Sequence, residues 1–574
     1  MEDIIRFSYC PQRDQVLLCG KEKNKSYQFY LLDLNSGIRK QLTHQVNGSF
    51  LGFLNNSGDK FYLFVDKAGN ESGHWEELDI KTNQTRNISR GLSDFCSYEF
   101  ALGEINDDLA YCWFTRDDDS GIIRYENLIS DSVKAVEIYK SNKEEISFPI
   151  VSTDGQIMAF YSENNERIAL KLWNNRISKV DEISQFDTAR ELELLFISEN
   201  NFLFYLLGAE LYKYDIFTNR TVLISKLQSN VQYLGNFNKK VLFSADVKGN
   251  NEILEVDLET NKVGKINLGE LGNNYYQIFF RSSRNSLLFL GSTINKATDL
   301  YEISSTGEIS SKNLNSEPET DFSTKEINFL NKDTKLQIQG WLFYDKAQKR
   351  PLIINLHGGP HACAGKGYSK ITSWFLKEGF DYFELNYSGS SSFGEEFKRS
   401  IYGDPGEKEC LDIYHANQYF VRNCGYQQEQ IYLQGDSYGG FLALLFAGKF
   451  PGVFSKIISV VGIGDLEKCY EEFSDQLKAM FNRLFEGSPK ERPMAYKKSN
   501  PITYLPKVKD QILIINGLND IRCPTEQMKK YLAKANKLQK SVEVIWFKGG
   551  HMDLLSSNSH MENYLLNTKR FLDN

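Results

Sequence analysis

Residues 1 to about 315 alternate between apolar and polar positions over short stretches that are separated by Asn, Gly, Ser and Asp. An alternation with a period of two places successive side chains on opposite faces of a strand, so this half predicts short β-strands. The 31 Tyr and 39 Phe of the chain favour the same structure, because aromatic side chains pack well on a pleated surface.

One phrase recurs along this half: an apolar strand end, an acidic residue, and then turn residues such as Asn, Thr, Ser or Gly. Where clear copies are adjacent, their acidic residues are 42 to 46 positions apart. The acidic residues of the clear copies are Asp33, Asp79, Asp215, Asp257 and Glu302. A four-stranded unit repeated every ~40–50 residues is typical of a β-propeller. We therefore expect an all-β propeller of about seven blades over residues 1–318.

Beyond the polar stretch at 315–319 the pattern changes, and residues 319–574 form the second predicted domain. Continuous apolar runs now alternate with stretches of helical periodicity. These runs lie at 352–356, 382–385, 457–461, 512–515 and 542–546. Such runs predict a mostly parallel sheet with helices on both faces, and catalytic groups are expected on loops beyond the C-terminal ends of its strands.

A serine stands at a sharp turn within this second domain. An apolar strand ends in Gly435-Asp436-Ser437-Tyr438-Gly439, and a helical run follows at once. Glycines two positions before and after Ser437 let strand and helix approach, because a side chain at either position would collide. The turn holds the serine in a strained backbone with its hydroxyl exposed. We interpret Ser437 as a nucleophile; an accidental surface turn is the alternative.

Two later strands end in residues that complete a catalytic set. One is followed by Asp520 and the next by His551, which gives the order Ser, Asp, His of an α/β-hydrolase. In this hypothesis His551 removes the proton of Ser437, and Asp520 orients and stabilises the imidazole. Asp465 is the rival acid and His560 the rival base.

The oxyanion formed in acyl transfer needs hydrogen-bond donors. We assign the backbone N–H of Tyr438, directly after the nucleophile, and that of Gly359 in the loop His357-Gly358-Gly359-Pro360. The alternative is that the two glycines only make a turn.

The formal net charge of −8 at pH 7 argues against nucleic acid or an anionic membrane as a partner. The nine cysteines are scattered and include no C-x-x-C pair, which fits reduced thiols better than disulfides or a zinc site. No basic and apolar leader is visible at the N-terminus. We expect a cytoplasmic protein with no metal or other cofactor, and homo-oligomerisation stays open.

The second domain resembles the prolyl oligopeptidase family, and within it the acylaminoacyl-peptidase branch. The motifs that carry the resemblance are His357-Gly358-Gly359-Pro360, residues 386–394 (Asn-Tyr-Ser-Gly-Ser-Ser-Ser-Phe-Gly), residues 435–440 (Gly-Asp-Ser-Tyr-Gly-Gly), Asp520-Ile521-Arg522-Cys523-Pro524 and Gly550-His551. The resemblance implies a serine peptidase acting on short peptides, with a propeller that excludes folded proteins. It also implies that Arg522 holds the carbonyl of a substrate residue; an ion pair that tunes the loop is the alternative.

The resemblance leaves other functions open. An esterase would use the same catalytic set. A dipeptidyl or aminopeptidase would need propeller carboxylates for a free amine, but we interpret Glu76 and Glu77 as a solvated strand face. A non-catalytic propeller scaffold is the least favoured alternative.

Overall fold

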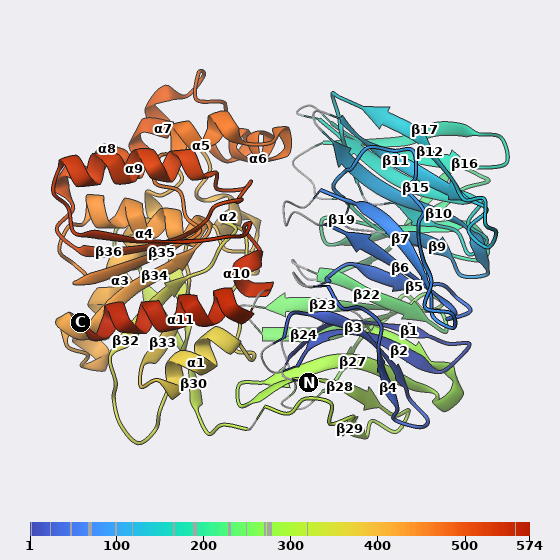
Figure 1. Cartoon of the computed structure of the whole chain (residues 1–574), viewed down its shortest axis with the longest axis horizontal. Coiled ribbons are helices and arrows are strands. Elements are labelled where there is room, and N and C mark those ends of the chain that lie inside the picture. Colours follow the sequence, from blue (N-terminus) through green and yellow to red (C-terminus); the bar gives the residue numbers. More distant parts are fainter. Residues whose placement is uncertain are drawn as a thin grey trace.

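A computed structural model describes the whole chain except residue 2 and the segments 23–24, 46–48, 67–71, 98–99, 117–118, 148, 165–166, 188–191, 228–230, 248–249, 269–270, 272–277, 318 and 557. Figure 1 shows two domains side by side, a propeller of strands and a sheet covered by helices. The last propeller strand ends at Ser311 and the first strand of the second domain begins at Ser323. The predicted boundary residue, Pro318, lies outside the described residues.

Seven antiparallel sheets form the propeller, which confirms the predicted fold class and blade number. The first three blades are β1 (Asp3–Cys10) to β4 (Arg39–Gln41), with β2 (Gln15–Lys21) and β3 (Gln28–Asp33); β5 (Gly52–Leu54) to β8 (Thr85–Asn87), with β6 (Lys60–Val65) and β7 (His74–Asp79); and β9 (Ala101–Gly103) to β12 (Lys134–Ser141), with β10 (Asn106–Arg116) and β11 (Asp119–Glu126).

The fourth blade has two short strands, β13 (Glu145–Ile146) and β14 (Ile150–Val151), beside β15 (Ile157–Glu163), β16 (Arg167–Asn174) and β17 (Lys179–Asp187). The last three blades are β18 (Leu192–Ile197), β19 (Phe202–Leu207), β20 (Glu210–Asp215) and β21 (Arg220–Lys226); β22 (Val231–Phe237), β23 (Lys240–Val247), β24 (Asn250–Asp257) and β25 (Val263–Ile266); and β26 (Ile278–Arg281), β27 (Ser286–Thr293), β28 (Lys296–Ile303) and β29 (Ile309–Ser311).

The recurring acidic residue has a local structural role in four blades. The Oδ1 atom of Asp79 accepts the amides of Lys81 and Thr82 at 3.0 and 2.7 Å, which closes the turn between β7 and β8. Asp33, Asp215 and Asp257 make the same pair of bonds to the amides two and three positions ahead. The repeat in the sequence is therefore a repeated Asx turn.

Glu302 of the last blade departs from this pattern. It accepts from Arg281 at 3.1 Å, and Arg281 in turn contacts Asp14 of the first blade, with Nε and Oδ1 2.7 Å apart. Arg281 is fully buried. The first and last blades are thus joined by a buried ion-pair network across the closure of the ring.

An eight-stranded sheet forms the core of the second domain, in the order β30-β31-β33-β32-β34-β35-β36-β37. Its first two strands are antiparallel to their neighbours and the rest are parallel. The strands are β30 (Ser323–Leu330), β31 (Gln337–Tyr344), β32 (Leu352–Leu356), β33 (Asp381–Asn386), β34 (Ile431–Asp436), β35 (Lys456–Val460), β36 (Gln511–Gly517) and β37 (Val542–Phe547).

Helices cover both faces of this sheet, as predicted (Figure 1). On β32, Leu352 and Ile354 pack with the core that includes α3 (Lys408–Cys424), α4 (Tyr438–Lys449) and α9 (Thr525–Lys537), while Ile353 packs with α1 (Lys370–Lys377) and α11 (Asn558–Asp573). Burial on both faces explains why the strand is apolar except at Asn355. The remaining helices are α2 (Glu395–Arg399), α5 (Leu466–Glu472), α6 (Asp475–Phe485), α7 (Pro493–Ser499), α8 (Pro501–Tyr504) and α10 (Asp553–Ser556).

Candidate active site

Ser437 lies between the end of β34 and the start of α4, in the strained backbone expected of it. Its φ is 53° and its ψ is −115°, a region that side chains disfavour. A Cβ at Gly435 would lie 2.3 Å from the carbonyl oxygen of Gly439, and one at Gly439 would lie 2.1 Å from that of Leu356. The glycines are therefore required by close backbone contacts, as the sequence predicted.

The structure brings Ser437, His551 and Asp520 together. His551 Nε2 lies 3.0 Å from Ser437 Oγ, and His551 Nδ1 lies 2.8 Å from Asp520 Oδ2. His551 and Asp520 are both buried. This is the relative placement that general-base activation of a serine requires.

Asp520 and His551 are brought together because they follow adjacent strands of the sheet. Asp520 follows β36 and His551 follows β37, and these strands pair in parallel. The loops beyond them are tied by the amide of Asn519, which donates to Gly549 O at 3.0 Å. Asp553 Oδ2 accepts the amide of Gly550 at 2.8 Å and so fixes the loop that carries His551.

Backbone donors fix the second carboxylate oxygen of Asp520. Its Oδ1 accepts the amides of Arg522 and Cys523 at 2.9 and 2.8 Å. The carboxylate is therefore oriented with Oδ2 toward His551. The side chain of Arg522 is half-buried, two residues beyond the acid.

The rival residues lie in other surroundings. Asp465 caps α5, accepts from Asn500 at 3.0 Å and pairs with Lys530 at 2.5 Å, and hydrogen bonds from Lys530 and Asn500 hold the pKa of this buried carboxyl below its usual range. The ring of His560 packs 5.1 Å from that of Phe547. The geometry thus favours Asp520 and His551 over both.

Gly359 lies in the loop after β32, and Tyr438, directly after Ser437, is the first residue of α4. Gly359 has a φ of 127°, and a Cβ on its neighbour Gly358 would come 3.3 Å from Ser437 Cβ. His357 uses both ring nitrogens within this region, because Nδ1 lies 2.7 Å from Gly358 O and Nε2 lies 2.8 Å from Ser390 Oγ. Burial lowers the pKa of His357 to about 4, so its imidazole is neutral near pH 7.

Asp436, directly before the nucleophile, is a residue that sequence reasoning left without a role. Desolvation of its carboxyl by the surrounding protein raises its pKa to about 6, while His551 and the amide of Gly358 oppose that rise. Its position directly before Ser437 was the feature of the sequence that could have marked Asp436 as a residue of the site.

Asp520, Cys523 and His551 are the described residues whose donor atoms could hold a metal, since these atoms lie within 4.8 Å of one another. Nitrogen, oxygen and sulfur donors in this number suit Zn²⁺. However, burial and the nearby Asp520 raise the pKa of the Cys523 thiol well above its usual range, which opposes the thiolate that a metal needs. A metal would also compete with the hydrogen bond between His551 and Asp520.

The propeller carboxylates Glu76 and Glu77 correct one expectation. Glu77 is only 4% exposed and pairs with Lys60 at 3.0 Å and with Arg86 at 2.8 Å. Glu76 lies 3.2 Å from His74. The interpretation as a solvated strand face is therefore wrong for Glu77, because the alternating pattern did not reveal the two cations that reach it.

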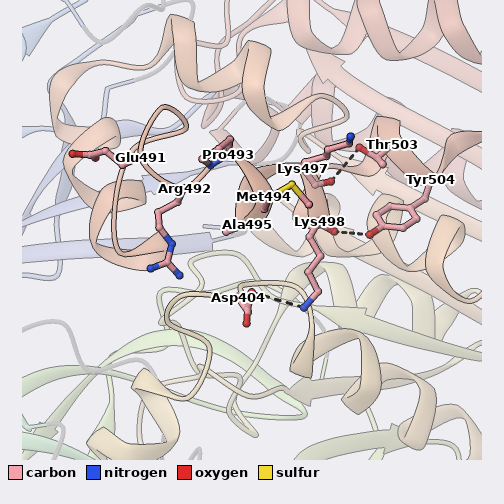
Figure 2. Close-up of a pocket in the computed structure, with 10 residues that line it drawn as sticks. All are labelled: Asp404, Glu491, Arg492, Pro493, Met494, Ala495, Lys497, Lys498, Thr503 and Tyr504. Carbon is pink, nitrogen blue, oxygen red and sulfur yellow. Dashed lines mark hydrogen bonds and ion pairs between the residues drawn. The ribbon is translucent and has the colours of Figure 1, made fainter.

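A separate pocket of about 580 Å³ lies at the surface near α7 and α8 (Figure 2). Its lining includes Asp404, Arg492, Met494, Lys498 and Tyr504, and Lys498 pairs with Asp404 at 3.8 Å. None of its lining residues is a predicted site residue. The site around Ser437 is thus distinct from this pocket.

Comparison with known proteins bears on the second domain. Residues 366–574 match the prolyl oligopeptidase family. This segment belongs to the prolyl oligopeptidase family. All three residues of the Ser437, Asp520 and His551 set lie within it. In the part of the chain that the structure describes, no helix has the length and apolar character needed to cross a membrane.

Curated relatives of this family segment include acylamino-acid-releasing enzymes. That of rice is 27% identical over 226 residues, which are 38% of this chain and 29% of the relative. That of mouse is 30% identical over 207 residues, 33% of this chain and 26% of the relative. The chain thus matches less than a third of the length of these relatives.

Similarity of fold extends over both domains. An acylaminoacyl peptidase of Pyrococcus horikoshii superposes with a TM-score of 0.75 at 16% identity, covering 100% of this chain and 96% of that one. The propeller and the prolyl oligopeptidase family domain therefore share one overall architecture with a solved structure.

Proposed function

We propose that this protein is a serine peptidase that hydrolyses short peptides through an acyl-enzyme intermediate, with Ser437 as nucleophile, His551 as general base and acid, and Asp520 as the residue that orients the imidazole. The observation that carries the proposal is the continuous contact from Asp520 Oδ2 through His551 to Ser437 Oγ, with distances of 2.8 and 3.0 Å. The resemblance of the family segment to acylamino-acid-releasing enzymes supports peptide bonds as the target.

In the proposed mechanism, His551 Nε2 accepts the hydroxyl proton as Ser437 Oγ attacks the substrate carbonyl. The carbonyl oxygen gains negative charge and is stabilised by the N–H groups of Tyr438 and Gly359. His551 then gives the proton to the departing amine, and the acyl-enzyme forms. A water molecule repeats the same sequence and releases the acyl group.

Backbone donors are favoured for this oxyanion hole because the His357 ring is committed elsewhere. Its two nitrogens contact Gly358 O and Ser390 Oγ, and its pKa of about 4 leaves no positive charge to contribute near pH 7. Arg522 would bind the carbonyl of the substrate residue before the scissile one, as the family resemblance implies. Its position two residues after Asp520 is consistent with that role.

We place the protein in the acylaminoacyl-peptidase branch, and a paired assay tests this. Acetyl-alanyl and acetyl-phenylalanyl chromogenic amides are compared with free-amine counterparts and a matched p-nitrophenyl ester, with Ser437→Ala as the blank. Cleavage of blocked amides supports the proposal. Cleavage of free-amine substrates alone would indicate an aminopeptidase or dipeptidyl peptidase, and hydrolysis of the ester alone would indicate an esterase.

We further propose a cytoplasmic location, supported by the nine cysteines, which form no disulfide with one another in the structure. Fractionation of the source cells tests it. Homo-oligomerisation is the remaining proposal on partners, and light scattering of the purified protein tests that.

A further inference from the structure

The two proposed oxyanion donors belong to separate segments, Gly359 to the loop after β32 and Tyr438 to the first turn of α4. Tyr387, which follows β33, contacts the loop after β32. Its hydroxyl donates to the carbonyl oxygen of His357 at 2.8 Å, and its ring stacks on the His357 ring with centroids 4.3 Å apart and planes 20° apart. Tyr387 is fully buried. The phenol of Tyr387 thus contacts both the backbone and a side chain of the loop that carries Gly359.

Tyr387 also faces the start of α4. Its ring lies 6.4 Å from that of Tyr438, with planes 28° apart, which is within the range of stacked aromatic pairs. The hydroxyl of Tyr438 donates to Glu409 Oε1 at 2.8 Å. The residue whose amide is the proposed donor is therefore anchored through its own side chain.

Glu409 is itself fixed at the N-terminus of α3. Its two carboxylate oxygens accept the amide of Gly406 at 3.0 and 2.9 Å. The side chain is completely buried, which raises its pKa to about 7, while the donors of Gly406 and Tyr438 oppose that rise. Gly406 has a φ of 88°, and a Cβ there would come 2.4 Å from Leu445 of α4, so α3 and α4 are in close contact at this point.

We propose that Glu409 and Tyr387 are positioning residues of the oxyanion hole. Together with Tyr438 and His357 they form a brace (Glu409, Tyr438, Tyr387 and His357) that fixes the separation of the two donor amides, and its members other than His357 are buried. Donors that are already oriented need no reorganisation when the oxyanion forms, so the brace acts on the transition state more than on substrate binding. This inference rests on the proposed serine peptidase function.

The test removes one hydroxyl from the brace and one from a matched pair elsewhere. Tyr438→Phe deletes the bond to Glu409 and keeps both the ring and the backbone amide. Tyr426→Phe is the control, because Tyr426 Oη donates to the buried carboxylate of Asp381 at 2.7 Å, and neither residue belongs to the brace. Each variant thus removes a tyrosine hydroxyl that donates a hydrogen bond to a buried carboxyl group.

We expect Tyr438→Phe to lower kcat about tenfold, less than the 10²–10³-fold cost of deleting an oxyanion donor outright. KM should stay within about twofold, since the ground-state carbonyl needs these donors less. Affinity for a peptide aldehyde, which forms a tetrahedral adduct on Ser437, should fall by the same factor as kcat. Tyr426→Phe should leave kcat and aldehyde affinity unchanged. Equal effects of the two variants would overturn the proposal.

Glu409→Leu and Tyr387→Phe extend the test if Tyr438→Phe does not fold. Where Tyr438→Phe folds, the double variant Tyr438→Phe with Glu409→Leu should lose little more kcat than Glu409→Leu alone, because the two substitutions remove the donor and the acceptor of the same hydrogen bond. A loss of kcat in the double variant equal to the product of the two single losses would contradict the brace. Wild-type labelling by a fluorophosphonate, with Ser437→Ala as blank, separates the two failures. Ser437-dependent labelling with no effect of the brace variants overturns only this inference, and absent labelling overturns the proposed function as well.

Discussion

Arg483 of α6 and Glu163 of β15 are 320 positions apart and form an ion pair of 2.6 Å between the two domains. The paired carboxylate has a neighbour, because Glu145 lies opposite Glu163 on the adjacent strand. Burial raises the pKa of Glu145 to about 7, Arg483 opposes that rise and Glu163 adds to it. Arg483 thus pairs with one propeller carboxylate and lowers the pKa of a second.

Arg483→Ala should change substrate access more than stability. Arg483 is 48% exposed, so the pair contributes at most about 1 kcal/mol to folding. Loss of a link between the domains should favour their separation and admit longer peptides. We expect kcat/KM for a long peptide to rise relative to that for a dipeptide amide. Arg570→Ala removes an exposed ion pair with Glu543 inside one domain, and it should leave this ratio unchanged.

Ser437→Ala should abolish turnover and keep the fold. Loss of a nucleophile that acts as a unit with its base costs on the order of 10⁶-fold in kcat. Circular dichroism and the thermal midpoint should match the wild type, because the hydroxyl contacts only His551 among the hydrogen bonds described for it. Substantial residual hydrolysis in this variant would refute the proposed mechanism.

Asp520→Asn and Asp465→Asn should distinguish the two candidate acids. The first replaces the acceptor of His551 Nδ1–H and favours the wrong tautomer, so kcat should fall about 10⁴-fold. The second removes the ion pair with Lys530 and keeps a side-chain oxygen that can cap α5, so it should lower stability slightly and leave kcat within a few-fold. The reverse ranking of kcat losses would show that Asp465 is the acid.

Glu409→Gln should alter the pH dependence of stability. The folded pKa of about 7 exceeds the ordinary value of 4.5, so the folded state holds the proton more tightly than the unfolded chain. Wild-type stability should therefore fall as pH rises from about 4.5 to 7, by up to about 3 kcal/mol relative to the variant. Urea unfolding at pH 5 and pH 8 measures this. Glu526→Gln, at an exposed position on α9, is the control and should show no such trend.

Gly439→Ala should prevent correct folding of the second domain. The added Cβ would lie 2.1 Å from Leu356 O, where only a shift of the backbone could relieve the contact. We expect a loss of about 3 kcal/mol or more. Gly264→Ala is the matched control, because a Cβ there meets no atom within 4 Å. A folded Gly439→Ala protein of normal thermal midpoint would contradict this account of the elbow.

Local rules made several features readable from the sequence alone. At the turn around Ser437, Gly435 is required by a contact with Gly439 only four positions ahead, although Gly439 is required by the distant Leu356. The repeated Asx turns at Asp33, Asp79, Asp215 and Asp257 involve residues two and three positions ahead. Apolar runs buried on both faces gave the parallel sheet, and the spacing of the repeats gave the blades. Each of these depends on near neighbours or on a fixed period.

Only the tertiary structure decided which distant groups meet. Asp465 and Asp520 both follow strands of the sheet, and the pairing of β36 with β37 places Asp520 beside His551 while Lys530 pairs with Asp465. Three other contacts likewise join segments with no shared sequence pattern. They are the ion pairs of Glu77 with Arg86 and of Arg483 with Glu163, and the hydrogen bond between Tyr438 and Glu409. Side-chain contacts across the fold carry no periodic signal, because they depend on how whole elements pack.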